Sequence, residues 1–158
     1  MISKIKNGQI IPRINLSNYQ DGNFSTDNLW QKKNLIIFFF AKLDLNIKRY
    51  LIELNSAYEL IKEQNAELLA VSGVNDKGIV REFIAKENIK FNILFDKEGL
   101  ITDKFLIDKK PILFITDRFF SLYRAYEQLP QKEEVLSSLK FLEKQCPECG
   151  VSHWEDNL

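Results

Sequence analysis

Only two cysteines and one histidine occur among the 158 residues of the sequence. All three lie near the C-terminus, so a Ser-His-Asp set has no histidine elsewhere in the chain to act as its base. The six glycines are scattered, which leaves no Gly-rich loop of the kind that holds a phosphate group. The sequence therefore supports neither a serine hydrolase nor a phosphate-loop nucleotide-binding protein.

The chain also lacks net charge, because 22 basic residues balance 22 acidic ones. No basic block is present, so we expect no nucleic acid and no membrane among its partners. The most apolar run, Leu35–Phe40, is far shorter than the roughly 20 residues that cross a bilayer. Residues 1–9 never develop the apolar core of a signal peptide. We therefore expect a cytoplasmic protein.

Apolar residues are abundant enough for one substantial core. They make up 45% of the sequence and include twelve phenylalanines. A chain of 158 residues is too short for two comfortable domains, and it contains no internal repeat and no linker rich in Pro, Gly or Ser. We predict a single domain over residues 1–145, followed by a cysteine-bearing tail over residues 146–158.

Hydrophobic periodicity predicts alternating strands and helices. Leu35–Phe40 is apolar on both faces, as in a central strand that is covered on both sides. From Ile47 to Ile61 the apolar residues fall at helical spacing, which predicts an amphipathic helix. A second strand over Leu68–Val71 precedes a second helix whose apolar positions start at Ile79, with Asn75 or Asp76 as its cap.

The remaining elements complete an α/β pattern. They are an N-terminal hairpin or edge strand around Asp21–Asn23, a short strand at Ile93–Phe95, a short helix after Gly99, an antiparallel pair at Ile112–Ile115 and Phe120–Tyr126, and a helix from near Pro130 to about Lys144. Crossovers of this kind bury a mostly parallel sheet between helices. We predict a thioredoxin-like fold with a central mixed sheet flanked by helices; periodicity alone also allows a small doubly wound sheet.

Segments spread over most of the chain resemble the peroxiredoxins, specifically the alkyl hydroperoxide reductase and thiol-specific antioxidant (AhpC/TSA) family. The matching segments are Ile10–Leu16 with Asp21-Gly22, Lys32–Ala41, Ala70–Val74, Phe91–Asp96 with Glu98-Gly99, and Pro111–Asp117. The resemblance implies a redoxin domain of the thioredoxin superfamily with antioxidant or thiol-disulfide oxidoreductase activity.

The sequence departs from this family at the position of the chemistry. The family places a threonine, often a proline, and then the peroxidatic cysteine where the first core strand runs into the next helix. Asp44, Leu45 and Ile47 stand at the corresponding positions, and no cysteine is near them. An isoleucine cannot attack an O–O bond, so Ile47 marks a degenerate peroxidatic position and argues against ordinary peroxidase activity.

Two features of the late strand are also implied by the resemblance. The family's arginine beside the nucleophile is not evident, because Lys109 and Lys110 occupy the region before that strand. The proline that precedes this strand is often cis in thioredoxin-fold proteins, which makes Pro111 a candidate cis-proline. A trans proline that starts an edge strand is the alternative.

The tail contains the one cluster of reactive residues, Cys146-Pro147-Glu148-Cys149 followed by His153. In one interpretation Cys146 and Cys149 are a redox pair in a CxxC motif, although the end of the preceding helix disfavours a thiolate. In another, Cys146, Cys149 and His153 bind zinc or iron, one ligand short of a full set. In a third, the tail has no specific chemistry.

These observations lead to two functional hypotheses. The first is a peroxiredoxin-like redoxin that has lost its peroxidatic position and uses the pair Cys146/Cys149, with a thiol reductant or a partner protein. The second is a non-catalytic binding or assembly module whose tail holds a metal ion through the two cysteines and His153. A homodimer is compatible with either hypothesis, and the sequence leaves open whether the protein is an enzyme.

Overall fold

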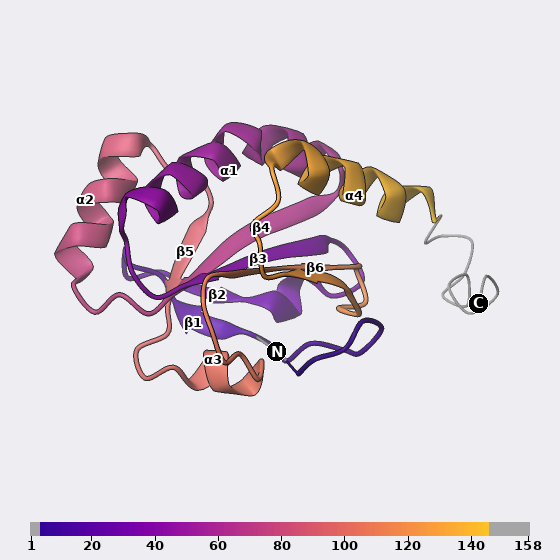
Figure 1. Ribbon diagram of the computed structural model, residues 1–158, viewed down its shortest axis with the longest axis horizontal. Coiled ribbons are helices and arrows are strands. Elements are labelled where there is room, and N and C mark those ends of the chain that lie inside the picture. The colour runs from indigo at the N-terminus through magenta and orange to yellow at the C-terminus, as the bar shows by residue number, and fades with distance from the viewer. Residues whose placement is uncertain (1–3, 146–158) are drawn as a thin grey trace.

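A five-stranded mixed sheet forms the centre of the molecule (Figure 1). The computed structural model describes residues 4–145. The sheet has the order β5-β4-β3-β6-β7. Its strands are β3 (Asn34–Phe40), β4 (Ala66–Ser72), β5 (Asn92–Phe95), β6 (Ile112–Thr116) and β7 (Leu122–Tyr126). β3, β4 and β5 run parallel to one another, whereas β6 is antiparallel to both β3 and β7.

β3 lies at the middle of the sheet because both of its faces are apolar. All six residues from Leu35 to Phe40 are fully buried. Alternate side chains enter two separate clusters: Phe38 packs in one with the first helix, and Phe39 packs in the other against Phe105 and Phe114. The prediction of a central strand covered on both sides is confirmed.

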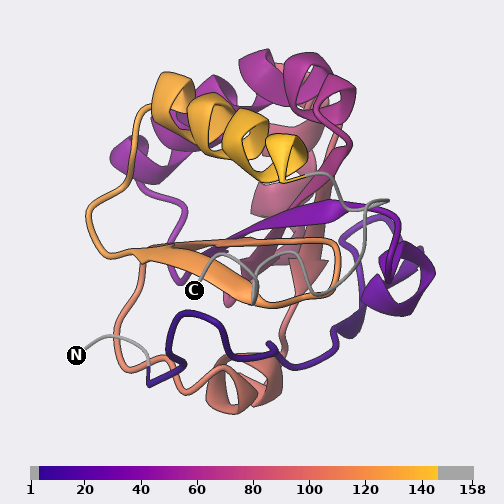
Figure 2. The ribbon, with the colours of Figure 1, turned by 90° about the vertical axis from the view of Figure 1, so that its right-hand side faces the viewer.

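Helices cover the two faces unequally. On one face lie α1 (Leu45–Glu63), α2 (Lys77–Glu87) and α4 (Lys132–Lys144), and on the other lies the short α3 (Leu100–Lys104) with the N-terminal segment. Figure 2 shows α4 above the sheet and α3 below it. This arrangement confirms the predicted thioredoxin-like α/β fold. No helix among residues 4–145 combines the length and the apolar character that a membrane span requires.

Side-chain caps set the starts of α1 and α2, the helices that follow the parallel strands β3 and β4. Asp44 caps α1 and Asp76 caps α2, each accepting a hydrogen bond from the backbone N–H three residues further on. α4 starts two residues after Pro130, close to the predicted position, with Gln131 as its N-cap. The Pro130 carbonyl accepts a hydrogen bond from the Tyr50 hydroxyl at 2.7 Å, which joins the start of α4 to α1.

A two-stranded hairpin precedes the first central strand, as predicted. It pairs β1 (Asn15–Ser17) with β2 (Asn23–Ser25), and Asp21 in the turn has a positive φ of 66°. A short 3-10 helix, η1 (Thr26–Leu29), then leads toward β3. Arg81 on α2 donates to the backbone carbonyl of Tyr19 at 2.5 Å, so the hairpin is fixed against the helix layer.

Candidate functional site

The first turn of α1 contains Ile47, the residue that the resemblance to the family aligns with the peroxidatic cysteine. The Asp44 carboxylate accepts a hydrogen bond from the Ile47 N–H at 3.0 Å. The Ile47 side chain is 7% exposed and packs in the core cluster under α1. This position therefore holds a hydrocarbon that faces the core, and the amide that begins the helix is satisfied by a carboxylate from the same chain.

A half-buried lysine, Lys110, lies at the edge of the sheet, close to the end of β3 and to the loop after β4. The Lys110–Pro111 peptide bond is cis. Lys110 Nζ packs close to Gly73. A Cβ atom added to Gly73 would lie 3.6 Å from Lys110 Nζ and 3.9 Å from the Phe40 carbonyl oxygen. Burial lowers the pKa of Lys110, while the negative charges of Asp96 and Asp103 oppose that shift.

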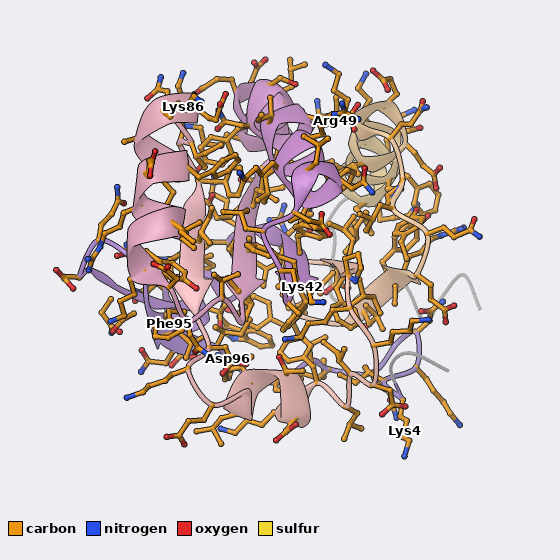
Figure 3. The ribbon with its side chains drawn as sticks, turned by 60° about the vertical axis from the view of Figure 1, so that its left-hand side comes forward. Lys4, Lys42, Arg49, Lys86, Phe95 and Asp96 are labelled. Atoms are coloured by element: carbon orange, nitrogen blue, oxygen red, sulfur yellow. The ribbon has the colours of Figure 1, made fainter. Side chains whose placement is uncertain are left out.

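Asp96 is a buried carboxylate at the end of β5, with 3% of its surface exposed. Its two oxygens accept hydrogen bonds from the Ile101 N–H at 3.1 Å, the Thr102 N–H at 3.0 Å and the Thr102 hydroxyl at 3.0 Å. Figure 3 faces this edge of the molecule and shows Asp96 beside Phe95, with Lys42 from the end of β3 to their right. Asp96 therefore anchors the start of α3, and both of its carboxylate oxygens accept hydrogen bonds there.

A buried tyrosine fills the space beneath the loop that leaves β4. The Tyr19 hydroxyl donates to the Val74 carbonyl at 2.7 Å and lies 2.8 Å from Ser72 Oγ. Burial raises the pKa of Tyr19, and the hydrogen bond with Ser72 lowers it in part. Its ring packs 5.2 Å from that of Phe95. The phenol is thus neutral at ordinary pH and holds the β4–α2 loop by a hydrogen bond.

Replacing Tyr19 with phenylalanine should lower the free energy of unfolding by about 1–3 kcal/mol, because the Val74 carbonyl then loses its hydroxyl partner. Urea denaturation of the two proteins measures the difference. Tyr123→Phe on β7, where the ring is only partly buried, is the matched control and should change stability by less than about 0.5 kcal/mol. Equal effects of the two substitutions would contradict the assigned role of the Tyr19 hydroxyl.

The predicted cysteine and histidine site of the tail follows α4 in the sequence. Cys146 directly follows Gln145, the last described residue, so Cys146, Cys149 and His153 lie outside the described part of the chain. α4 ends at the right of Figure 1, whereas α1 begins at the left. Glu143, in the last turn of α4, accepts a hydrogen bond from Asn34, the first residue of β3.

Comparison with known proteins identifies the family of this chain. Residues 7–130 match the AhpC/TSA family. The chain belongs to this family. It is 25% identical over 124 residues to a putative peroxiredoxin bcp of Buchnera aphidicola subsp. Schizaphis graminum (strain Sg), an alignment that covers 78% of this chain and 77% of that protein.

Solved structures of other proteins share the fold of this AhpC/TSA chain. The peroxidoxin BcpB from Mycobacterium tuberculosis superimposes with a TM-score of 0.77 at 13% identity, covering 87% of this chain and 98% of that one. A putative thiol:disulfide interchange protein DsbE from Chlorobium tepidum gives a TM-score of 0.75 at 16% identity, with coverages of 89% and 98%. The chain is therefore a peroxiredoxin-like protein of the thioredoxin fold.

Within this AhpC/TSA scaffold, the described residues supply no thiol, since both cysteines of the sequence come after residue 145. A helix N-terminus favours an anion, and a thiolate is the form in which cysteine attacks. Here the Asp44 carboxylate already provides that anion. Residues 4–145 thus have the fold of the family without a cysteine thiol.

Residues 4–145 contain no cluster of three or more His, Cys, Asp or Glu residues arranged to hold a metal ion. Glu143, a carboxylate close to the tail along the chain, is bonded to Arg118 and Asn34. The candidate ligand set Cys146, Cys149 and His153 therefore has no preformed cluster in the described residues to complete it.

Proposed function

We propose that this chain is a non-peroxidatic redoxin, a thiol-disulfide oxidoreductase whose redox pair is Cys146 and Cys149. One observation carries the proposal. The first turn of α1 presents Ile47 and the Asp44 carboxylate where the family's thiolate would lie, so the chain's thiol chemistry is confined to the Cys-Pro-Glu-Cys motif after α4. The family assignment supports redox chemistry of this general kind.

The motif is suited to reversible disulfide formation. Two residues separate the cysteines, a spacing shared by thiol-disulfide oxidoreductases, in which a dithiol transfers two electrons to a substrate disulfide. The substrate disulfide becomes two thiols, and the pair becomes an intramolecular disulfide that a second thiol must reduce. The proposal therefore includes a thiol reductant or a partner protein. The balanced charge and the lack of a basic block support the further proposal that neither nucleic acids nor membranes are among its partners.

A metal-binding tail is the competing function. The two-residue gap between Cys146 and Cys149 lets both sulfurs reach one zinc ion at about 2.3 Å, and His153 offers a third ligand. Such a tail would make the protein a binding or assembly module, with the missing ligand supplied by a second chain or by water. In the metal-binding function the reduced protein holds a metal ion, whereas in the redox function it holds two free thiols. One set of measurements therefore separates the two functions.

Equilibration of the protein with mixtures of oxidised and reduced glutathione tests whether the two cysteines form a disulfide. In the full chain, Cys146 and Cys149 should form an intramolecular disulfide, counted by alkylation of the remaining thiols and mass spectrometry. Cys146→Ser and Cys149→Ser should each abolish it and leave one free thiol. Elemental analysis of the reduced protein should find no stoichiometric metal.

Two results would contradict the proposed function. Stoichiometric zinc or iron in the parent protein, lost in both serine variants, would establish the metal-binding tail instead. Cysteines that stay reduced at every glutathione ratio, without metal, would show that the motif has no redox role. Size-exclusion chromatography of the same samples determines whether a homodimer is present and whether its formation depends on the cysteines.

A further inference from the structure

The amine of Lys110 is half-buried and has no polar partner in the described fold. The residue lies between α3 and β6, in the segment that leads the chain back into the sheet. Its Nζ makes no hydrogen bond and no ion pair with any other residue in the range 4–145. Burial lowers the pKa of Lys110. More of this amine is therefore neutral at a given pH than of a fully solvated lysine amine.

Two carboxylates act on Lys110 without forming an ion pair with it. Asp96 at the end of β5 and Asp103 on α3 favour the charged amine, but burial has the larger effect. Both oxygens of Asp96 accept hydrogen bonds at the start of α3, and Asp103 is exposed, so water screens its charge. Neither carboxylate therefore locks Lys110 in an ion pair, and the lone pair of the neutral amine is available for reaction.

Gly73 leaves space beside this amine. A Cβ atom added to Gly73 would have Lys110 Nζ as its nearest neighbour at 3.6 Å, followed by the Ala41 Cα at 3.8 Å and the Phe40 carbonyl oxygen at 3.9 Å. The last two are backbone atoms, and Gly73, Ala41 and Lys110 all keep some exposed surface. A small reagent in solvent therefore meets backbone and a missing side chain, not a bulky group, on the Gly73 side of Nζ.

We propose that Lys110 is a nucleophilic amine and a site of covalent acylation, which accepts acyl groups from activated donors of the thioester class. A neutral lysine amine attacks a carbonyl carbon, whereas an ammonium does not, and desolvation is one of the ways in which proteins activate such a lysine. The neighbouring Lys109 is exposed and lacks this environment. The reaction at Lys110 uses no cysteine, so it is independent of the proposed redox function.

Acylation converts the amine to an amide. The Nζ lone pair attacks the carbonyl carbon of the thioester, a C–N bond forms and the C–S bond breaks. The leaving thiolate takes up the proton that the nitrogen loses, so no oxidant or reductant takes part. The amide is neutral, and the modification removes the positive charge on which Asp96 and Asp103 act. Acylation thus makes this edge of the sheet more acidic.

Acetylation of the folded full chain by a small acetyl thioester tests the proposal. At pH 8, peptide mass spectrometry should find Lys110 modified at least about threefold faster than Lys109. The variant Cys146→Ser/Cys149→Ser should show the same preference, which excludes transfer of acetyl groups from a cysteine. In concentrated urea the two lysines should react at similar rates, because only the folded chain gives them different surroundings.

Gly73→Ala tests the role of the space beside Nζ. The added methyl group lies at an ordinary van der Waals distance from Nζ, so the fold is retained while the approach to the amine narrows. Acetylation of Lys110 should slow by about threefold or more, because reacting atoms must approach to within about 3.5 Å, and the rate at Lys109 should not change. Gly78→Ala on α2 is the matched control, since its Cβ meets only Asp76 Oδ1 at 3.4 Å, and it should leave both rates unchanged.

Equal rates at Lys109 and Lys110 in the folded protein would overturn the inference, as would a preference for Lys110 that persists in urea. An unchanged rate at Lys110 in folded Gly73→Ala would also overturn it, and circular dichroism checks that each variant is folded. The glutathione experiment on the two cysteines decides the proposed redox function separately, so either proposal can fail without the other.

Discussion

Replacing Phe39 with alanine should lower the free energy of unfolding by about 3–5 kcal/mol. Phe39 is fully buried at the middle of the central strand. Its ring lies 4.9 Å from that of Phe105 and 5.6 Å from that of Phe114, in centroid distance. Alanine removes these contacts and leaves a cavity between α3 and the sheet, which the surrounding strands cannot close. Urea denaturation measures the loss.

Phe141→Ala is the matched control for this prediction. Phe141 is 44% exposed on α4 and stacks on Tyr123, with ring centroids 5.8 Å apart. Its loss should cost about 1 kcal/mol, the usual value of an aromatic pair near the surface. If Phe39→Ala costs no more than this control, the two-sided burial of β3 does not carry the stability assigned to it.

The central strand also shows which parts of the fold the sequence predicts well. Leu35–Phe40 has no polar position, and only a strand covered on both faces buries every side chain of such a run. The amphipathic pattern of α1 and the cap at Asp76 are similarly local signals, read from residues a few positions apart. The prediction of a helix from near Pro130 to about Lys144 is also close, since α4 spans Lys132–Lys144.

The candidate site depends on contacts that local patterns do not contain. Lys110 meets Gly73 because β4 and the loop before β6 end at the same edge of the sheet, although 37 residues separate them in the sequence. The sequence left cis and trans Pro111 equally open, and the structure has the cis bond. Asn34 reaches Glu143 across 109 residues. The helix cap at Asp44 was not predicted, although an aspartate that directly precedes an apolar periodic segment is a known signal for one.

The separation of scaffold and thiols is the main functional consequence of this geometry. In the family to which the chain belongs, the helix after the first core strand supplies the environment of the nucleophile. Here that helix starts with the Asp44 carboxylate and the buried Ile47, while both cysteines come after α4 in the sequence. Under the proposed function, the redox chemistry belongs to Cys146 and Cys149 and not to the first turn of α1.

Asp96→Ala should cause the second largest loss of stability after Phe39→Ala. We expect the free energy of unfolding to fall by about 2–4 kcal/mol. Alanine leaves three donors without their carboxylate: the Ile101 N–H, the Thr102 N–H and the Thr102 hydroxyl. Asp103→Ala is the matched control, because Asp103 is exposed yet also acts on Lys110, and it should cost less than about 0.5 kcal/mol.

The same substitution should also change the chemistry of Lys110. Burial already lowers the pKa of this amine, and the charge of Asp96 is the largest effect that opposes the shift. Removing that charge lowers the pKa of Lys110 further, so more of the amine is neutral at a given pH below its ordinary value of 10.5. Labelling by an amine-selective reagent at pH 8, followed by peptide mass spectrometry, should show faster modification of Lys110 in folded Asp96→Ala than in the parent. An unchanged labelling rate, with the stability loss present, would mean that Asp96 anchors α3 without acting on the lysine at the edge of the sheet.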